Sequence, residues 1–457
     1  MRTAALAVMA ATLVAEIGCG SGSASSTTTS ATVPSGQASV AKKKGRTAIW
    51  PTYHANLART AIDRTSPALR GPRRIWSTPL DGQVYAEPLA VGNRVYAATE
   101  NNTVYALNAR NGKVTWHRHL GTPVDASTLP CGNIEPVTGI TGTPAISGDS
   151  IFATAFLSGP RHVLFALSLK RGKIESRRQI DAPGSDPAVH QQRSALSVSH
   201  GRVYVPFGGL FGDCGPYKGR VTSVKVKAFK KLRVFTAGVN REGGIWAPSG
   251  AAVDRKGNLF VVTGNGDSSG FDYGNSVIRL TPQLQQTSFW RPTNAAELNQ
   301  SDTDLGSVGP ALLGGGRLFA IGKEGVGAIL STANLGGIGG QLFQGDVCGG
   351  SFGGTAYQAP LLFVPCNDGL VALRVNGNSF STAWKSDSFS AGPPIIAGGA
   401  VWSIDTDSGT LTAFAPGNGR VLTTQDLGSV THFATPSAGG GRIFAPAGSQ
   451  IVGFAGV

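Results

Sequence analysis

A short unit that recurs eight times constrains the fold of this 457-residue chain more than any other feature. Each unit holds a small residue or Pro, an apolar run, a Gly/Asn turn and an apolar-aromatic strand, followed by a third strand and usually a fourth. Four short strands joined by tight turns form a propeller blade. The sequence therefore predicts an all-β, eight-bladed β-propeller with four-stranded blades. The expected second strands are 93–99, 149–155, 201–207, 257–263, 316–322, 360–366, 399–405 and 441–447.

The two ends of the repeat region indicate how the ring closes. The last unit finishes at Val457, after its third strand. The segment RRIWSTPLDG (73–82) precedes the first unit and matches the fourth-strand pattern of KVTWHRHLG (113–121). We therefore expect an N-terminal strand to complete the last blade, which leaves no open sheet edge between the chain ends. The aromatic ends of fourth strands are expected to pack blades together rather than bind a ligand: Trp76, Trp116, Trp290 and Trp384.

The chain ahead of the repeats is typical of an exported protein. Residues 1–19 combine Arg2, a short apolar run and small residues, which predicts an export signal too short to span a bilayer. A small residue directly before Cys19 predicts lipidation of that cysteine, although Glu16 stands where lipoproteins carry an apolar residue. Ordinary cleavage and secretion is the alternative. Residues 20–46 predict a flexible Ser/Thr/Gly-rich tether, and 47–457 the propeller.

Four cysteines follow Cys19, and an even number in an exported chain predicts two disulfides out of three possible pairings. We favour Cys348–Cys366, which are close in sequence, and that choice leaves Cys131–Cys214. No CxxC or HxxxH spacing favours structural zinc.

The formal net charge of +14 is large, and KKKGR (42–46) and KVKAFKKLR (225–233) carry much of it. Such charge either solvates the surface or attracts phospholipid headgroups and anionic envelope polymers. No helix-turn-helix or aromatic RNA-binding pattern accompanies it, so we do not expect nucleic acid as a partner.

The repeats resemble those of pyrroloquinoline-quinone (PQQ)-type propellers. ALNARNGKVTW (106–116) is close to the ALDAxTGKxxW pattern of that family, and the resemblance extends over the chain after the tether. The Gly-His and Trp-Asp dipeptides of WD40 repeats are missing. The resemblance implies an eight-bladed fold and points to a place for a cofactor.

Four segments resemble the active-site loops of PQQ-dependent alcohol dehydrogenases. The resemblance implies metal ligation by Asn265 in TGNG and by Asp213 in GGLFGDCGPYKGR. Asp267, in the same loop as Asn265, is a further metal candidate because it carries the oxygen donors that hard metals prefer. It implies a catalytic base at Asp302 or Asp304 in SDTDLGSVGP. Trp246 in GGIWAPSG and Lys323 in GKEG would contact the cofactor.

Two functions follow from the resemblance. The first is a cofactor-free binding or scaffold protein in the cell envelope, similar to lipoproteins of the outer-membrane assembly factor B type. It would be a monomer, anchored to the membrane by lipid at the cell surface or in the periplasm, that contacts envelope proteins or polymers through loops 207–220 and 263–275. The alternative is a divergent PQQ- and calcium-dependent alcohol or sugar dehydrogenase. The adjacent Cys-Cys pair of those enzymes is absent, which favours the first function.

Overall fold

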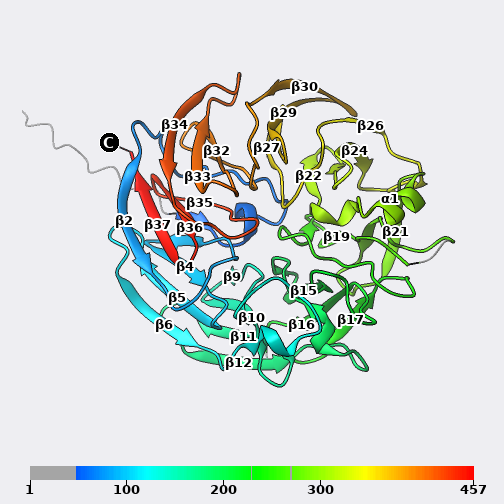
Figure 1. Cartoon of the computed structure of the whole chain (residues 1–457), viewed down its shortest axis with the longest axis horizontal. Helices are drawn as coiled ribbons and strands as arrows, with labels where there is room; N and C mark the ends of the chain where they lie inside the picture. Colours follow the sequence, from blue (N-terminus) through cyan, green and yellow to red (C-terminus); the bar gives the residue numbers. More distant parts are fainter. Residues whose placement is uncertain (1–47, 228, 268–269, 457) are drawn as a thin grey trace, which may run out of the picture. The chain divides into compact units, whose positions relative to one another are not determined.

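The computed structural model describes residues 48–227, 229–267 and 270–456. These residues form eight antiparallel sheets arranged as blades around a central channel (Figure 1). The predicted export signal, the tether and the lipidation site Cys19 lie outside the described residues. No helix of the described residues is long and apolar enough to cross a membrane.

The first four blades follow one another along the chain from blue to green in Figure 1. Their strands, from the channel outwards, are β3 (Leu89–Gly92), β4 (Arg94–Ala98), β5 (Thr103–Asn108) and β6 (Val114–His119) in blade 1; β9 (Ala145–Ser147), β10 (Ser150–Leu157), β11 (Arg161–Ser168) and β12 (Ile174–Gln179) in blade 2; β14 (Ser197–Ser199), β15 (Arg202–Gly209), β16 (Arg220–Lys225) and β17 (Arg233–Thr236) in blade 3; and β18 (Ala252–Val253), β19 (Leu259–Val262), β20 (Val277–Leu280) and β21 (Gln286–Arg291) in blade 4.

The remaining blades repeat this order. Their strands are β22 (Ala311–Gly314), β23 (Arg317–Ala320), β24 (Val326–Ser331) and β26 (Phe343–Asp346) in blade 5; β27 (Ala356–Gln358), β28 (Leu361–Cys366), β29 (Gly369–Asn376) and β30 (Ser379–Lys385) in blade 6; β31 (Ile395–Ala397), β32 (Ala400–Ile404), β33 (Thr410–Phe414) and β34 (Val421–Asp426) in blade 7; and β35 (Ser437–Ala438), β36 (Arg442–Ala447), β37 (Gln450–Ala455) and β2 (Arg73–Pro79) in blade 8. The eight predicted second strands are confirmed as β4, β10, β15, β19, β23, β28, β32 and β36.

The prediction of four strands per blade holds for most blades but is incomplete for three of them. β1 (Ala48–Trp50) adds to the channel edge of blade 1, β13 (His190–Gln191) pairs with one end of β15, and β25 (Gly337–Ile338) runs parallel to β21. The other described elements are β7 (Val124–Asp125), β8 (Val137–Thr138), helix α1 (Ala295–Ser301) and the 3-10 turns η1 (Tyr53–Ala55), η2 (Ala126–Thr128), η3 (Pro187–Val189) and η4 (Leu305–Ser307).

The predicted closure of the ring is confirmed. β2 pairs antiparallel with β37, from Arg73 opposite Ala455 to Pro79 opposite Gln450. The two ends of the propeller therefore share one sheet, and unfolding one end breaks the last blade.

Fourth-strand tryptophans join neighbouring blades as the sequence predicts. Trp76 covers Gly112 in the outer turn of blade 1, and its indole N–H donates to the carbonyl of Ala109 at 3.2 Å. A Cβ on Gly112 would lie 2.7 Å from the Trp76 ring, so only glycine fits this turn, which also has a φ of +70°. Trp116 and Trp384 make the same contact with the following blades.

Residues 50–66, here called the N-terminal plug, cross one end of the channel. Their backbone or side chains bond to the first strand, or its turn, of each blade in chain order, from Trp50 opposite Ala90 in blade 1 to Thr65 beside Gly440 in blade 8. We call this end, formed by the turns within strand pairs one–two and three–four, the plugged mouth. The other end, formed by the remaining loops, is the open mouth.

Candidate functional site

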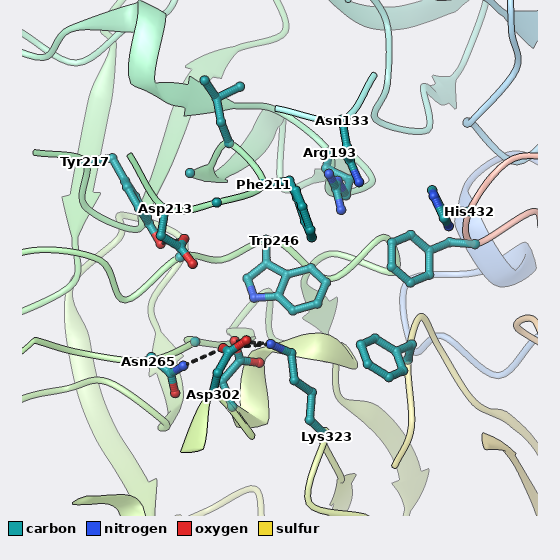
Figure 2. A pocket seen from close by; sticks show the side chains of 18 of the residues that line it. Asn133, Arg193, Phe211, Asp213, Tyr217, Trp246, Asn265, Asp302, Lys323 and His432 are labelled. Carbon is teal, nitrogen blue, oxygen red and sulfur yellow. Dashed lines mark hydrogen bonds and ion pairs between the residues drawn. The ribbon is translucent and has the colours of Figure 1, made fainter. Parts of the chain in front are cut away.

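The open mouth contains a cavity of about 520 Å³ beside blades 3, 4 and 5. Six of the seven side chains predicted for a cofactor site line it. They are Asp213, Trp246, Asn265, Asp302, Asp304 and Lys323. They come from loops between second and third strands and from loops that lead into first strands, which meet at the same mouth in this topology (Figure 2).

Lys323 is the centre of the polar part of the cavity. Its Nζ lies 2.9 Å from Asp302 Oδ1 and 3.5 Å from Asp304 Oδ2. Asp302 ends helix α1 in a left-handed conformation with a φ of 52° and keeps its side chain exposed, whereas Asp304 is buried. The two carboxylates therefore hold one ammonium group between solvent and the protein interior.

The environment shifts two proton equilibria in this cluster. Burial raises the pKa of the Asp304 carboxyl to about 7; Lys323 opposes this rise, and the charges of Asp302 and Asp213 add to it. For Lys323, burial disfavours the charge, but the carboxylates of Asp304 and Asp302 outweigh burial and raise its pKa. Asp304 can thus take up or release a proton near neutral pH while Lys323 stays charged.

Aromatic side chains form the apolar part of the cavity. The Trp246 ring lies between Phe211 and the Lys323 side chain in Figure 2, and the Lys323 ammonium is 5.8 Å from the ring centroid. Phe433 and Phe352 also line the cavity, and they stack on one another with ring centroids 6.2 Å apart. A flat ring could lie against the exposed part of Trp246, because offset stacking is the preferred aromatic contact.

Sequence reasoning missed several lining residues. Arg193 places its guanidinium 5.7 Å from the Phe433 centroid, so a second cation faces the cavity opposite Lys323. The others are Tyr85, Asn133, Phe211, Tyr217, Phe352, His432 and Phe433. Most of them lie in loops that lead into the first strands of blades 1, 2, 3, 6 and 8. The available signal was the aromatic or basic residue that stands four residues before the first strand in blades 1, 3, 6 and 8.

The side chains implied as calcium ligands do not converge on an ion. Asn265 Oδ1 accepts a hydrogen bond from Asn275 Nδ2 at 3.1 Å, and Asp213 Oδ1 accepts one from the Tyr217 hydroxyl at 2.5 Å. The Lys323 ammonium lies where a cation would neutralise Asp302 and Asp304. Calcium takes about six to eight oxygen ligands, so the site in this arrangement does not fit calcium.

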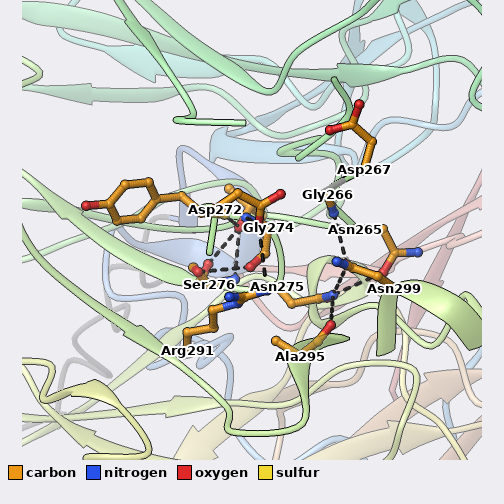
Figure 3. Close-up of polar contacts among 12 residues, drawn as sticks. Asn265, Gly266, Asp267, Asp272, Gly274, Asn275, Ser276, Arg291, Ala295 and Asn299 are labelled. Atoms are coloured by element: carbon orange, nitrogen blue, oxygen red, sulfur yellow. Dashed lines mark hydrogen bonds and ion pairs between the residues drawn. The ribbon is translucent and has the colours of Figure 1, made fainter. Parts of the chain in front are cut away.

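Asp267 does not line the cavity. It is exposed, points away from Asn265 in Figure 3, and accepts a hydrogen bond from the backbone N–H of Arg241 at 3.2 Å. Asn265 itself is held by loop contacts: Asn275 bonds to Asn299 of α1 at 2.7 Å, and Asn299 also accepts from the backbone N–H of Gly266 at 3.0 Å. This network holds Asn265, Gly266 and Asn275 against helix α1.

Both predicted disulfides form, and both lie at the open mouth. Cys131–Cys214 joins the loop that carries Asn133 to the loop that carries Asp213, so it connects two walls of the cavity. Cys348–Cys366 joins the loop leading into blade 6 to the end of β28. The pairing chosen from sequence spacing is confirmed.

Comparisons with known proteins define the class of this fold. The sequence profile of a family described as outer membrane protein assembly factor BamB matches residues 71–205. Among solved structures, quinohemoprotein alcohol dehydrogenase ADHIIG from Pseudomonas putida HK5 is similar with a TM-score of 0.72 and 13% identity, covering 90% of this chain and 80% of that one. The propeller is of the PQQ-like type.

Two further solved structures are similar to this chain. A europium-containing methanol dehydrogenase has a TM-score of 0.70 and 15% identity over 90% of this chain and 98% of that one. BamB from Moraxella catarrhalis has a TM-score of 0.58 and 13% identity over 84% of this chain and 97% of that one. No curated protein matches the chain by sequence. At these identities the likeness concerns the fold.

Proposed function

We propose that this propeller is an exported binding protein whose open mouth holds a flat, carboxylate-bearing aromatic molecule of the chemical class of PQQ. The observation that carries the proposal is the convergence of Trp246, Lys323 and Arg193 on one cavity. The indole offers a flat apolar surface, and the two cations lie on different sides of it. A pocket with an aromatic surface and a few polar groups is typical of small-molecule sites.

The side chains that line the cavity fit a carboxylate-bearing ligand better than they fit a calcium ion. A flat tricarboxylate can pair with Lys323 and Arg193, whereas calcium would have to displace the Lys323 ammonium. When bound, a quinone would supply redox chemistry, and Asp304 would then be placed to exchange a proton at Oδ2 with a ligand hydroxyl. This placement of Asp304 supports an oxidoreductase activity as an extension of binding, and the site supports no calcium-dependent step.

Titration of the full chain with PQQ, followed by tryptophan fluorescence and calorimetry, tests this proposal. We expect saturable binding that calcium changes less than about twofold. Lys323→Met should weaken binding by about tenfold or more, since a charge-assisted contact contributes about 1.5–3 kcal/mol. Lys385→Met is the matched control, because Lys385 also pairs with an aspartate, Asp368, but lies outside the cavity. Absence of binding at millimolar PQQ would refute the proposal, and a tenfold gain with calcium would refute the metal-free site.

Protein docking at the open mouth is a second candidate, supported by two exposed aromatic side chains. Phe211 and Phe271 are 63% and 52% exposed and project from the loops of blades 3 and 4. Exposed aromatic residues are enriched in protein interfaces. Replacing both by Ser should abolish capture of an envelope partner and leave the melting temperature unchanged. Loss of PQQ binding in that variant would instead assign Phe211 to the ligand.

A further inference from the structure

The two mouths of the propeller carry opposite charge. Among the described residues, the turns of the plugged mouth contain eleven Lys or Arg and two acidic residues. The loops of the open mouth contain nineteen acidic residues and four Lys or Arg. The net charge of +14 therefore hides a separation of charge along the channel axis. The basic residues lie mainly in the turns of blades 1 to 4, whereas the acidic residues are spread over the loops of blades 1 to 7.

The basic residues form a continuous arc on the plugged mouth. The outer turns of blades 1, 2 and 3 read ARNGK (109–113), LKRGK (169–173) and, around position 228, VK and FKKL (226–232). Blade 4 continues the arc with Arg255 and Lys256. These turns hold ten of the eleven basic residues, the eleventh is Arg420 in blade 7, and all eleven side chains are exposed. Outer turns contact first turns of the same blade, for example Leu169 N–H to the Asp149 carbonyl at 2.7 Å, which places both sets at one face.

The two acidic residues of these turns do not neutralise the positive charge of the arc. Asp254 accepts hydrogen bonds from the backbone N–H groups of Lys256 and Asn258 at 2.8 and 2.9 Å, so it caps its own turn. Asp149 is the other acidic residue of these turns. Beside Asp254 lies an open groove of about 950 Å³, lined by Arg255, Lys256, Arg279 and Arg317. Arg279 and Arg317 donate to the carbonyls of Ala333 and Gly377, whereas Arg255 and Lys256 are exposed at the rim of the groove.

The N-terminal end of the described chain lies at the same face. Ala48 pairs with Gly92, the last residue of β3 before the first turn of blade 1, and 47 residues precede Ala48 in the sequence. A membrane-directed segment attached there would bring this face, rather than the acidic one, to a lipid surface. The separation of the basic residues over several blades fits an extended anionic plane better than a single peptide.

We propose that the plugged mouth docks on an anionic phospholipid bilayer and that the open mouth with its cavity faces away from it. Each basic residue near an anionic bilayer contributes about 1 kcal/mol, and the acidic open mouth is repelled, so the charges determine both binding and orientation. The proposal is independent of the ligand in the cavity.

Sedimentation of the full chain with vesicles tests the proposal. We compare phosphatidylcholine vesicles with vesicles that also contain phosphatidylglycerol, at low and high salt. The basic segment KKKGR (42–46) contributes to the anionic increment in every variant, so the charged face is isolated by comparing variants that all keep this segment. We expect stronger binding to the vesicles that contain phosphatidylglycerol. This extra binding should be lost at high salt, because salt screens the attraction between the basic side chains and the lipid.

The discriminating variant is Lys170→Glu/Arg171→Glu/Lys173→Glu. It should reduce the anionic increment by on the order of 100-fold. The control Arg161→Glu/Arg177→Glu/Lys385→Glu makes the same change in net charge away from the arc and should retain most of it. Equal loss in both variants, or equal binding to both vesicle types, overturns the proposal. Binding to a soluble polyanion without binding to anionic vesicles also overturns it, since the partner would then be a polymer.

Discussion

The plugged mouth and the open mouth are made from the same repeat, but they are filled in different ways. At the plugged mouth, fully buried Arg59 donates to the carbonyls of Tyr53 and Ala251 and to the hydroxyl of Ser197 at 2.8 to 3.1 Å. At the open mouth, Lys323 meets two carboxylates beside the cavity. One cation completes the fold, and the other faces space that a ligand can occupy.

The difference shows how a propeller separates stability from function. Arg59 donates to carbonyls that would otherwise be buried without a partner. Its own guanidinium can be buried because its N–H groups are hydrogen-bonded. Asp304 keeps one buried oxygen, Oδ1, without a protein partner, and its pKa is raised to about 7. The open mouth in turn holds both disulfides, which restrain loops that lack the hydrogen-bonded plug.

The largest expected effect comes from opening the disulfide of the open mouth. Cys131→Ser/Cys214→Ser should lower the free energy of unfolding by about 4.5 kcal/mol, from the entropy of the 83-residue loop that the bond closes. Denaturant titration measures it. An effect below about 1 kcal/mol would show that other contacts hold the cavity walls.

A somewhat smaller loss is expected at the plugged mouth. Arg59→Met should cost about 3 kcal/mol, because it leaves several buried acceptors without a donor. The affinity for PQQ should be unchanged in the folded variant. A loss of affinity in denaturant-free buffer would contradict the separation of the two mouths.

The pH dependence of stability should be governed in part by Asp304. Its pKa is about 7 in the folded state and near 3.8 in the unfolded chain, so the folded state holds one more proton between these values. The stabilisation that comes from the protonated Asp304 carboxyl is fully present below about pH 4 and is lost as the pH rises through 7. Denaturant titrations from pH 4 to 8 should show stability falling less steeply in Asp304→Asn than in the wild type. Glu100, buried with a pKa of about 7, acts in the same direction and remains in the variant. Parallel profiles would exclude this role.

The smallest effect on stability is expected for Lys323→Met. Asp302 is exposed and Asp304 can take up a proton, so the loss should stay below about 1 kcal/mol. Thermal unfolding of this variant beside Arg59→Met measures the contrast directly. A loss as large as that of Arg59→Met would mean that both cations are structural.

The architecture was readable from the sequence because each blade depends mainly on local signals. The apolar second strands, the Gly/Asn turns and the fourth-strand tryptophans gave eight blades and the closure by β2. The extra strands β1, β13 and β25 were missed, because they are two or three residues long and pair with strands that do not follow them directly in the chain. The position of Asp267 was wrongly expected in the site, since a loop of this length does not fix the direction of each side chain.

The sequence by itself determined the repeat, the disulfide cysteines and the loops that carry polar residues. Tertiary structure alone decided that residues 50–66 fill one mouth, that Arg193 faces the same cavity as Lys323, and that basic and acidic loops separate onto opposite faces. The physical reason is that strand formation depends on neighbours in the chain, whereas a channel and its two mouths exist only after the last blade closes on the first.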